Sequence, residues 1–120
     1  MKYLLMITAS PAAPHARSEA DRAAVYAEHD RLVALTRESG ELVGFVALAD
    51  PSNSRTVRVR AGVPAVTDGP YLEAKEFLAG YYLLDCETPA RAEELAALIP
   101  DARFTGIEVR PVMESGGLEM

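Results

Sequence analysis

Two side chains in this 120-residue chain are suited to acid–base chemistry. His29 carries an imidazole, which gains and loses a proton near neutral pH and can act as a general base once a partner orients it. Asp68 is the carboxylate that we expect to provide this orientation, on a turn that folds back over the helix carrying His29. Another interpretation is open: His29 is a core residue bonded to a backbone carbonyl or a tyrosine, and Asp68 only caps its own turn.

A charged segment that begins at Asp68 could hold the ligand of such a site. Asp68-Gly69-Pro70 is a turn signal, because Gly accepts positive φ while Pro fixes φ and lacks a donor. The residues that we expect to bind a ligand are Arg58, Tyr71, Glu73, Lys75 and Tyr81, with Arg58 or Lys75 holding an anion. The alternative is a solvated, salt-bridged patch that includes Glu76, in which Arg58 only blocks pairing at a sheet edge.

Tyr81 and Tyr82 are neighbours in an apolar run that is typical of a strand. Successive side chains of a strand point to opposite faces, so we expect at most one of the two to line a given pocket. The other would lie in the core or in a subunit interface.

Composition argues against several classes of function. A net charge of −6 and a pI of about 4.9 disfavour binding to nucleic acid or to an anionic membrane. His15 and His29 have no carboxylate or thiol set at ligand spacing, and the chain has no Gly-rich phosphate loop, so we expect neither a metal nor a cofactor. The single cysteine, Cys86, is expected to be a buried thiol. Without a secretion signal or a membrane span, the chain is expected to be cytoplasmic.

The periodicity of apolar residues predicts two helices among six strands. Strands are expected at 3–7, 42–48, 56–60, 63–67, 79–84 and 106–112, the first and fifth buried on both faces, and a second helix at 91–98. The first helix begins after the N-cap Ser18 and ends at about Ser39, before Gly40. Its core-facing stripe is Val25, His29, Leu32 and Leu35 or Thr36.

The order of these elements predicts an α+β, ferredoxin-like βαββαβ fold with an inserted β-hairpin at 56–67. Residues 1–114 would form a single domain, followed by a flexible tail at 115–120. Two helices cover one face of such a sheet and leave the other bare. A second copy of the chain is the simplest cover for this face, so we expect a homodimer that forms an α+β barrel.

The charged segment resembles the DGPFAETKE signature of the DGPF family, in the YCII-related superfamily. The matching residues are Asp68-Gly69-Pro70-Tyr71-Leu72-Glu73-Ala74-Lys75-Glu76, with departures at Tyr71, Leu72 and Ala74. The resemblance also takes in the opening at 1–3, the hairpin at 56–60, the run 80–83 and the ending at 107–112. It therefore covers nearly the whole chain.

This resemblance implies a ferredoxin-like dimer with a pocket in each subunit. In YCII-like relatives, a helical His and an Asp near the second helix form a proposed active-site pair, and one branch removes chloride from a chlorinated hydroquinone. His29 matches that His, but Ile99 stands where the Asp is expected. DGPF proteins are also associated with alternative sigma factors, which implies a regulatory context.

Two hypotheses about function follow. In the first, the chain binds or transforms an aromatic or carboxylated metabolite, with His29 as the acid or base, oriented by Asp68. A lyase or dehydrochlorinase-like activity would belong to this hypothesis. In the second, the chain is a non-catalytic module that binds a partner protein. An exposed charged segment and a His29 without a cavity beside it would favour the second.

Overall fold

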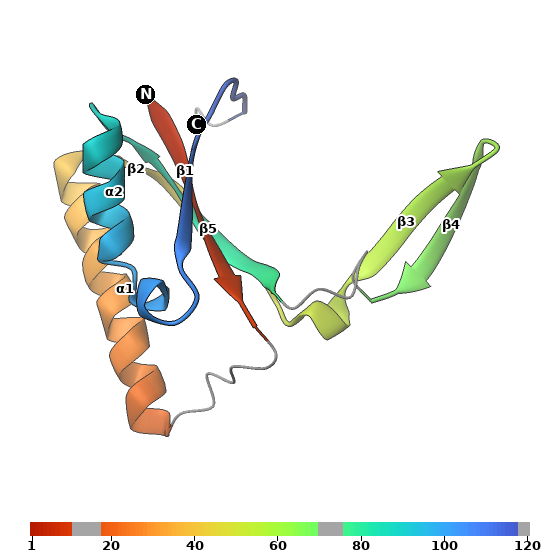
Figure 1. The fold of residues 1–120 in the computed structure, drawn as a ribbon, viewed down its shortest axis with the longest axis horizontal. Helices are drawn as coiled ribbons and strands as arrows, with labels where there is room; N and C mark the ends of the chain where they lie inside the picture. The colour runs from red at the N-terminus through yellow and green to blue at the C-terminus, as the bar shows by residue number, and fades with distance from the viewer. Residues whose placement is uncertain (11–17, 70–75, 118–120) are drawn as a thin grey trace.

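The structure is a computed structural model that describes residues 1–10, 18–69 and 76–117. A four-stranded antiparallel sheet with strand order β2-β5-β1-β6 is joined by a two-stranded sheet, β3-β4 (Figure 1). The strands are β1 (Lys2–Ala9), β2 (Leu42–Ala47), β3 (Arg55–Arg60), β4 (Val63–Asp68), β5 (Phe77–Asp85) and β6 (Ile107–Pro111). The helices are α1 (Glu19–Ser39) and α2 (Pro89–Ala97), with short 3₁₀ helices η1 (Pro51–Asn53) and η2 (Pro100–Arg103).

Both α-helices lie on one face of the larger sheet (Figure 1). The two central strands, β1 and β5, are longer than the outer two, and they pair with Leu5 opposite Tyr82. The sheet order, with both helices on one side, is consistent with the expected ferredoxin-like arrangement, and the α+β class is confirmed.

Within a single copy of the chain, β1 and β5 are buried on one face, and burial of their second face stays a prediction. Burial alternates along both strands, and the residues facing the helices are buried while their neighbours are partly exposed. In β1 the buried set is Tyr3, Leu5, Ile7 and Ala9. The apolar residues that alternate with this buried set therefore line the face of the sheet that the helices leave open. They are the partly exposed Leu4, Met6, Tyr81 and Leu83.

The ends of α1 follow from local sequence. The Ser18 hydroxyl accepts a hydrogen bond from the Asp21 amide, and Gly40 adopts φ of 80°, a left-handed conformation that suits glycine. Leu32 and Thr36 are buried, whereas Leu35 is exposed, so Thr36 continues the core stripe. The Thr36 hydroxyl donates to the Leu32 carbonyl, which satisfies this polar group in the core.

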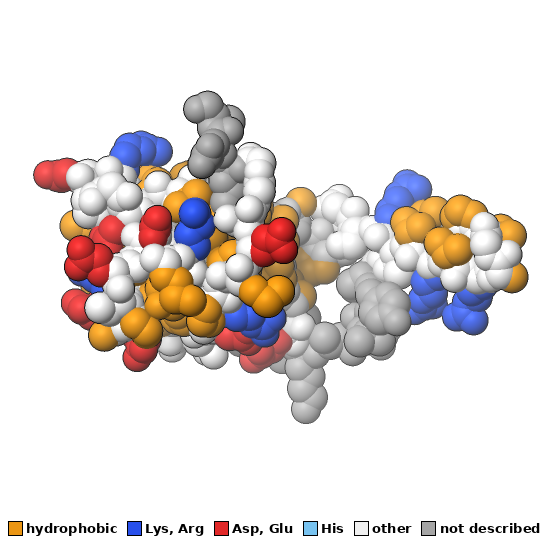
Figure 2. Space-filling view, turned by 90° about the horizontal axis from the view of Figure 1, so that it is seen from above, with side chains coloured by type: hydrophobic (Ala, Val, Ile, Leu, Met, Phe, Trp, Pro, Cys, Tyr) orange, Lys and Arg blue, Asp and Glu red, His pale blue; other side chains and the backbone are white. Residues whose placement is uncertain are grey.

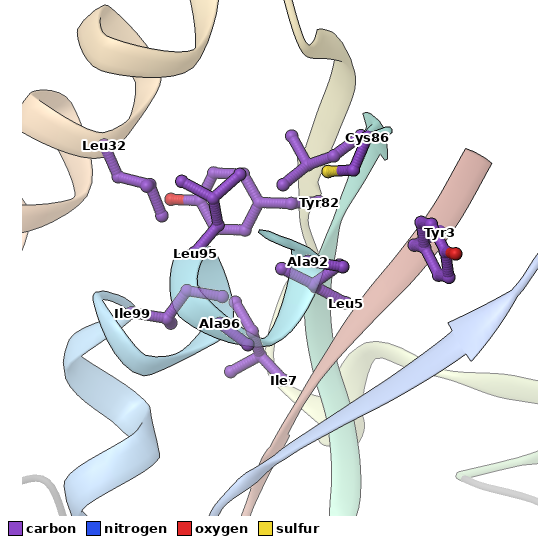
Figure 3. Packing of buried hydrophobic residues seen from close by; sticks show 11 residues of the cluster. Tyr3, Leu5, Ile7, Leu32, Tyr82, Cys86, Ala92, Leu95, Ala96 and Ile99 are labelled. Carbon is purple, nitrogen blue, oxygen red and sulfur yellow. The ribbon is translucent and has the colours of Figure 1, made fainter. Parts of the chain in front are cut away.

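The core lies between the larger sheet and the two helices. Buried side chains from β1, β5, both helices and the segment after α2 meet there (Figure 3). Tyr82 of β5 packs in this cluster with Leu32 of α1 and Leu95 of α2, and its hydroxyl points towards α1 (Figure 3). Cys86 is buried as predicted, and burial raises the pKa of its thiol.

Strands β3 and β4 form a hairpin that extends away from the larger sheet, on the side opposite the helices (Figure 1). Ala61 and Gly62 both have positive φ at its tip, as a two-residue hairpin turn requires. Register pairs Val57 with Val66 and Val59 with Pro64, so one face of the hairpin is apolar. Across the described residues, no helix is long and apolar enough to span a membrane.

Candidate functional site

His29 lies between two polar side chains that are far from it in sequence. Its Nδ1 is 2.6 Å from the Tyr82 hydroxyl, and its Nε2 is 2.9 Å from Oδ1 of Asp101. The imidazole and the Tyr82 ring are nearly parallel, with an interplanar angle of 11°. A hydrogen-bonded chain of Tyr82, His29 and Asp101 therefore joins strand β5, helix α1 and the 3₁₀ helix η2.

Each member of this chain is held by its own element. His29 lies one turn before the buried Leu32, so packing of α1 on the core turns the imidazole towards the sheet. Tyr82 is on the helix-facing parity of β5 and is only 4% exposed. Arg103 and Glu28 form two hydrogen bonds of 3.1 and 3.3 Å, which fix η2, and hence Asp101, against α1.

The acidity of Tyr82 bears on the direction of its hydrogen bond. Burial, with Asp101 and Asp30 adding negative charge, raises the pKa of Tyr82 to about 12. Tyr82 therefore keeps its proton at neutral pH and can donate a hydrogen bond to Nδ1 of His29. In the tautomer that accepts this bond, the ring proton is on Nε2, which donates to the Asp101 carboxylate. Such an arrangement resembles the oriented histidine that general acid–base catalysis requires.

Exposure differs between the two ends of this chain. The side chains of His29 and Asp101 are 23% and 18% exposed, whereas Tyr82 is buried in the core. A molecule arriving from solvent would therefore meet Nε2 of His29 and the Asp101 carboxylate first. Tyr82 holds the ring from behind and is best described as a positioning residue.

A cavity of about 690 Å³ opens beside this pair. It runs between α1, from Asp21 to Arg37, and the outer strand β2 with its neighbour β5. We call this the α1–β2 groove. Its walls are mostly apolar and aromatic, and the volume is within the range of small-molecule sites. The aromatic lining residues are Tyr26, Phe45, Tyr81, Tyr82 and Phe104.

Both Tyr81 and Tyr82 line the groove, contrary to the prediction that only one would do so. Four consecutive residues of β5, from Ala79 to Tyr82, contribute to its wall. β5 lies between β2 and β1, and its side chains alternate between the two faces of the sheet, so Tyr82 faces the helices and Tyr81 faces the open side. Among the described residues, the polar partners of the His29 ring are Tyr82 and Asp101 rather than Tyr81.

Asp68 does not orient His29. It ends β4, its side chain is 92% exposed, and its nearest charged partner is Arg55 at 3.9 Å. The hairpin extends away from α1 (Figure 1), so Asp68 at its end does not lie over the helix as predicted. Arg58 is also on this hairpin and does not line the groove. The predicted ligand-binding residues Tyr71, Glu73 and Lys75 lie outside the described residues.

Asp101 is the carboxylate that the sequence analysis missed. Ile99, where the resemblance placed an acidic residue, is fully buried in the core. The chain turns at Pro100 into η2. This turn directs the carboxylate of Asp101, two positions after Ile99, to His29. The available signal was an acidic residue directly after the Ile99-Pro100 end of the second helix.

Comparison with known proteins agrees with this architecture. The model of the YCII-related domain family matches residues 1–115. An uncharacterised protein of Rhizobium meliloti (strain 1021) is 39% identical over 77 residues, which is 62% of this chain and 62% of that protein. Because the family match covers nearly all of the sequence, the chain belongs to the YCII-related domain family.

Proposed function

We propose that this protein binds a small aromatic or carboxylated metabolite in the α1–β2 groove and transfers a proton through the His29–Asp101 pair. The observation that carries this proposal is an imidazole fixed at both nitrogens on the wall of an apolar cavity. Titratable groups with specific partners in a cleft are characteristic of functional sites. Aromatic walls favour a flat, apolar ligand body.

The occupied nitrogens of His29 restrict how a ligand can react. Nδ1 is engaged by the buried Tyr82, so exchange at that atom would require the core to open. Nε2 and Asp101 are accessible, and a ligand hydroxyl or carboxyl can insert there or replace the bond between them. With Nε2 protonated and Nδ1 accepting from Tyr82, the Asp101 carboxylate would accept the ligand proton, while Nε2 donates a hydrogen bond and Tyr82 keeps the ring in place. In a lyase step such as dehydrochlorination, the proton would pass to this carboxylate and chloride would leave with the electrons of the broken C–Cl bond.

The hypothesis of a non-catalytic partner-binding module predicted no cavity beside His29, and the groove argues against it. Glu76 is exposed, as that hypothesis also predicted, so part of the charged segment remains available to a partner. The link to alternative sigma factors and a cytoplasmic location stay predictions.

We further propose a homodimer in which two larger sheets stack through their open faces. Leu4, Met6, Tyr81 and Leu83 form an apolar strip on the face that neither helix covers. A partly exposed apolar strip of this kind is typical of subunit interfaces. Stacking two such sheets would give the α+β barrel expected from the sequence.

A thermal-shift screen with aromatic phenols and carboxylates would test the site. A ligand at 100 times its Kd should add about 2.7 kcal/mol to the free energy of unfolding. We expect this gain in the wild type and its loss in His29→Gln and Asp101→Asn. Asp68→Asn is the matched control, because Asp68 is an exposed carboxylate away from the groove. Binding that is indifferent to His29 and Asp101, or lost equally in Asp68→Asn, would contradict the proposal.

A turnover assay on each compound that binds would then separate an enzyme from a binding protein. Release of product by the wild type but not by Asp101→Asn, at a ligand concentration high enough to occupy the weakened site of the variant, would identify proton transfer at the pair. Binding without turnover would leave a metabolite-binding role.

A further inference from the structure

The β3–β4 hairpin has an apolar face that its own subunit leaves exposed. Val57 and Val59 are 62% and 65% exposed, and the cross-strand neighbour Val66 is 55% exposed. Figure 2 shows hydrophobic side chains on the hairpin beyond the body of the protein, with arginine side chains beside them. Among the described elements, β3 and β4 pack extensively only on each other. An isolated two-stranded hairpin is marginally stable in water, so this face requires a cover.

The α1–β2 groove has an apolar rim that is equally open. Tyr26 of α1 is 69% exposed, and Phe45 and Val46 of β2 are 51% and 37% exposed. β2 is also an outer strand of its sheet, and no strand in the described part of the chain pairs with its far side. An outer strand with apolar, exposed side chains is a template for association.

The dimensions of hairpin and groove match. The six residues of β3 span about 20 Å at the rise of a strand. The groove follows α1 from Asp21 to Arg37, which is about 24 Å at the rise of a helix. One hairpin can therefore cover the length of one groove.

Charge also favours a second copy of this chain as the partner. The hairpin, residues 55–68, carries three arginines and one aspartate, a net charge of +2 in a protein of −6. Helix α1 carries five acidic residues and three arginines, a net charge of −2. Arg58 and Arg60 are on the face of β3 opposite Val57 and Val59, so this charge difference would steer the approach of two copies rather than form contacts inside the groove.

The hairpin is placed to reach a partner rather than its own groove. It extends on the side of the sheet opposite the helices, whereas its own groove lies along α1 (Figure 1). A copy stacked on the open face of the sheet would lie on that same side. We propose that the β3–β4 hairpin of each subunit closes the α1–β2 groove of the other, with Val57 and Val59 over the groove. This inference rests on the proposed dimer and gives its groove a lid.

Closure by the partner would complete the site. A lid of valine side chains would exclude water from the His29–Asp101 pair, which strengthens its interaction with a polar ligand group. Arg58, which we predicted to bind ligand, is on the opposite face of β3 from Val57 and Val59 and would point away from the groove. The apolar face of the hairpin, rather than its arginines, would shape the ligand.

Cross-linking between unlike copies tests the inference. Val59→Cys and Tyr26→Cys proteins are mixed at equal amounts, allowed to exchange subunits and treated with a short bismaleimide. The native Cys86 is buried and 1% exposed, so it stays in place. Glu94→Cys replaces Tyr26→Cys in the control mixture, because Glu94 is an exposed residue of α2 that does not line the groove.

We expect a covalent dimer of Val59→Cys with Tyr26→Cys, in up to about half of the dimers after random mixing. The Glu94→Cys mixture should give little product. No covalent dimer, or equal yields in the two mixtures, would overturn the inference, as would a monomer by light scattering. Ligand binding is not part of this readout, so failure here is distinguishable from failure of the His29–Asp101 site.

Discussion

Replacement of Tyr82 by phenylalanine removes one hydrogen bond and leaves the packing of the ring. The lost bond is the 2.6 Å contact with Nδ1 of His29, in a part-buried position. An unsatisfied buried polar atom costs about 1 to 3 kcal/mol, and His29 is 23% exposed, so water can replace part of the lost bond. We therefore expect Tyr82→Phe to lower the free energy of unfolding by about 1 to 2 kcal/mol. For a domain of this size, the melting temperature should fall by about 4 to 8 °C.

Alkaline pH should reduce this difference. The pKa of Tyr82 is raised to about 12 from an ordinary value of 10, chiefly by burial. The stability that depends on the protonated hydroxyl is fully present below pH 10 and is lost as pH rises towards 12. A shift of about two pKa units corresponds to roughly 2 to 3 kcal/mol, which is enough to cancel the advantage of the wild type. Tyr82→Phe has no phenolic proton to lose at this position.

Urea unfolding of the wild type, Tyr82→Phe and Tyr81→Phe at pH 7 and at several values between 10 and 12 would measure both effects. Tyr81→Phe is the matched control, because it is the adjacent tyrosine on the opposite face of β5 and should change stability by less than about 0.5 kcal/mol. Equal losses in the two variants at pH 7 would refute the argument. A constant difference between the wild type and Tyr82→Phe up to pH 12 would also refute it.

Two further predictions concern the strands and helices that support the groove. Gly80→Ala should destabilise the fold by about 1 to 3 kcal/mol in urea unfolding, because the added Cβ would overlap the backbone carbonyl oxygen of Val46 on β2; Gly44→Ala, with open space at its Cβ, is the control. The pKa of Glu41 is lowered by its hydrogen bonds to Arg91, so their contribution to stability is present above the ordinary value of 4.5 and is lost as pH falls through the lowered pKa. The melting temperature of the wild type should therefore be higher than that of Glu41→Gln at pH 7. Calorimetry should show this difference in melting temperature shrinking in acid, and a difference that persists at pH 2 would contradict the prediction.

Local chemistry explains why the sequence predicted most of the fold. The boundaries of α1 depend on Ser18 and Gly40, and the hairpin turn depends on Ala61 and Gly62, all within a few residues of the structure they determine. Burial was harder to predict. Both faces of β1 carry apolar side chains, and this pattern does not reveal whether anything packs on the second face. A subunit interface and a two-sided core produce the same pattern in sequence.

The carboxylate partner of His29 could not be assigned for a different reason. Asp68 and Asp101 are both acidic residues at turns, and only the path of the chain distinguishes them. The hairpin carries Asp68 into solvent, whereas the turn at Pro100 brings Asp101 back to α1. A pair that is 72 residues apart is determined by the packing of α2 and η2 on the sheet, which no local motif reports.

The position of this carboxylate relative to Pro100 can be tested directly. The double variant Ile99→Asp with Asp101→Ala moves the acid to the position that the family resemblance indicated. Ile99 is fully buried in the core, so an ionised carboxylate there would lose its hydration without a partner, and this should lower the free energy of unfolding by about 4 kcal/mol or more. Asp101→Ala alone should be much less destabilising, because its side chain is 18% exposed.

Urea unfolding of the single and double variants would measure this difference, with Ile99→Val as the control for lost volume at the same position. A double variant as stable as Asp101→Ala, with its ligand binding restored, would show that position 99 can present a carboxylate to His29. A double variant much less stable than Asp101→Ala would show that the core of this chain accepts a carboxylate partner for His29 after Pro100 but not before it.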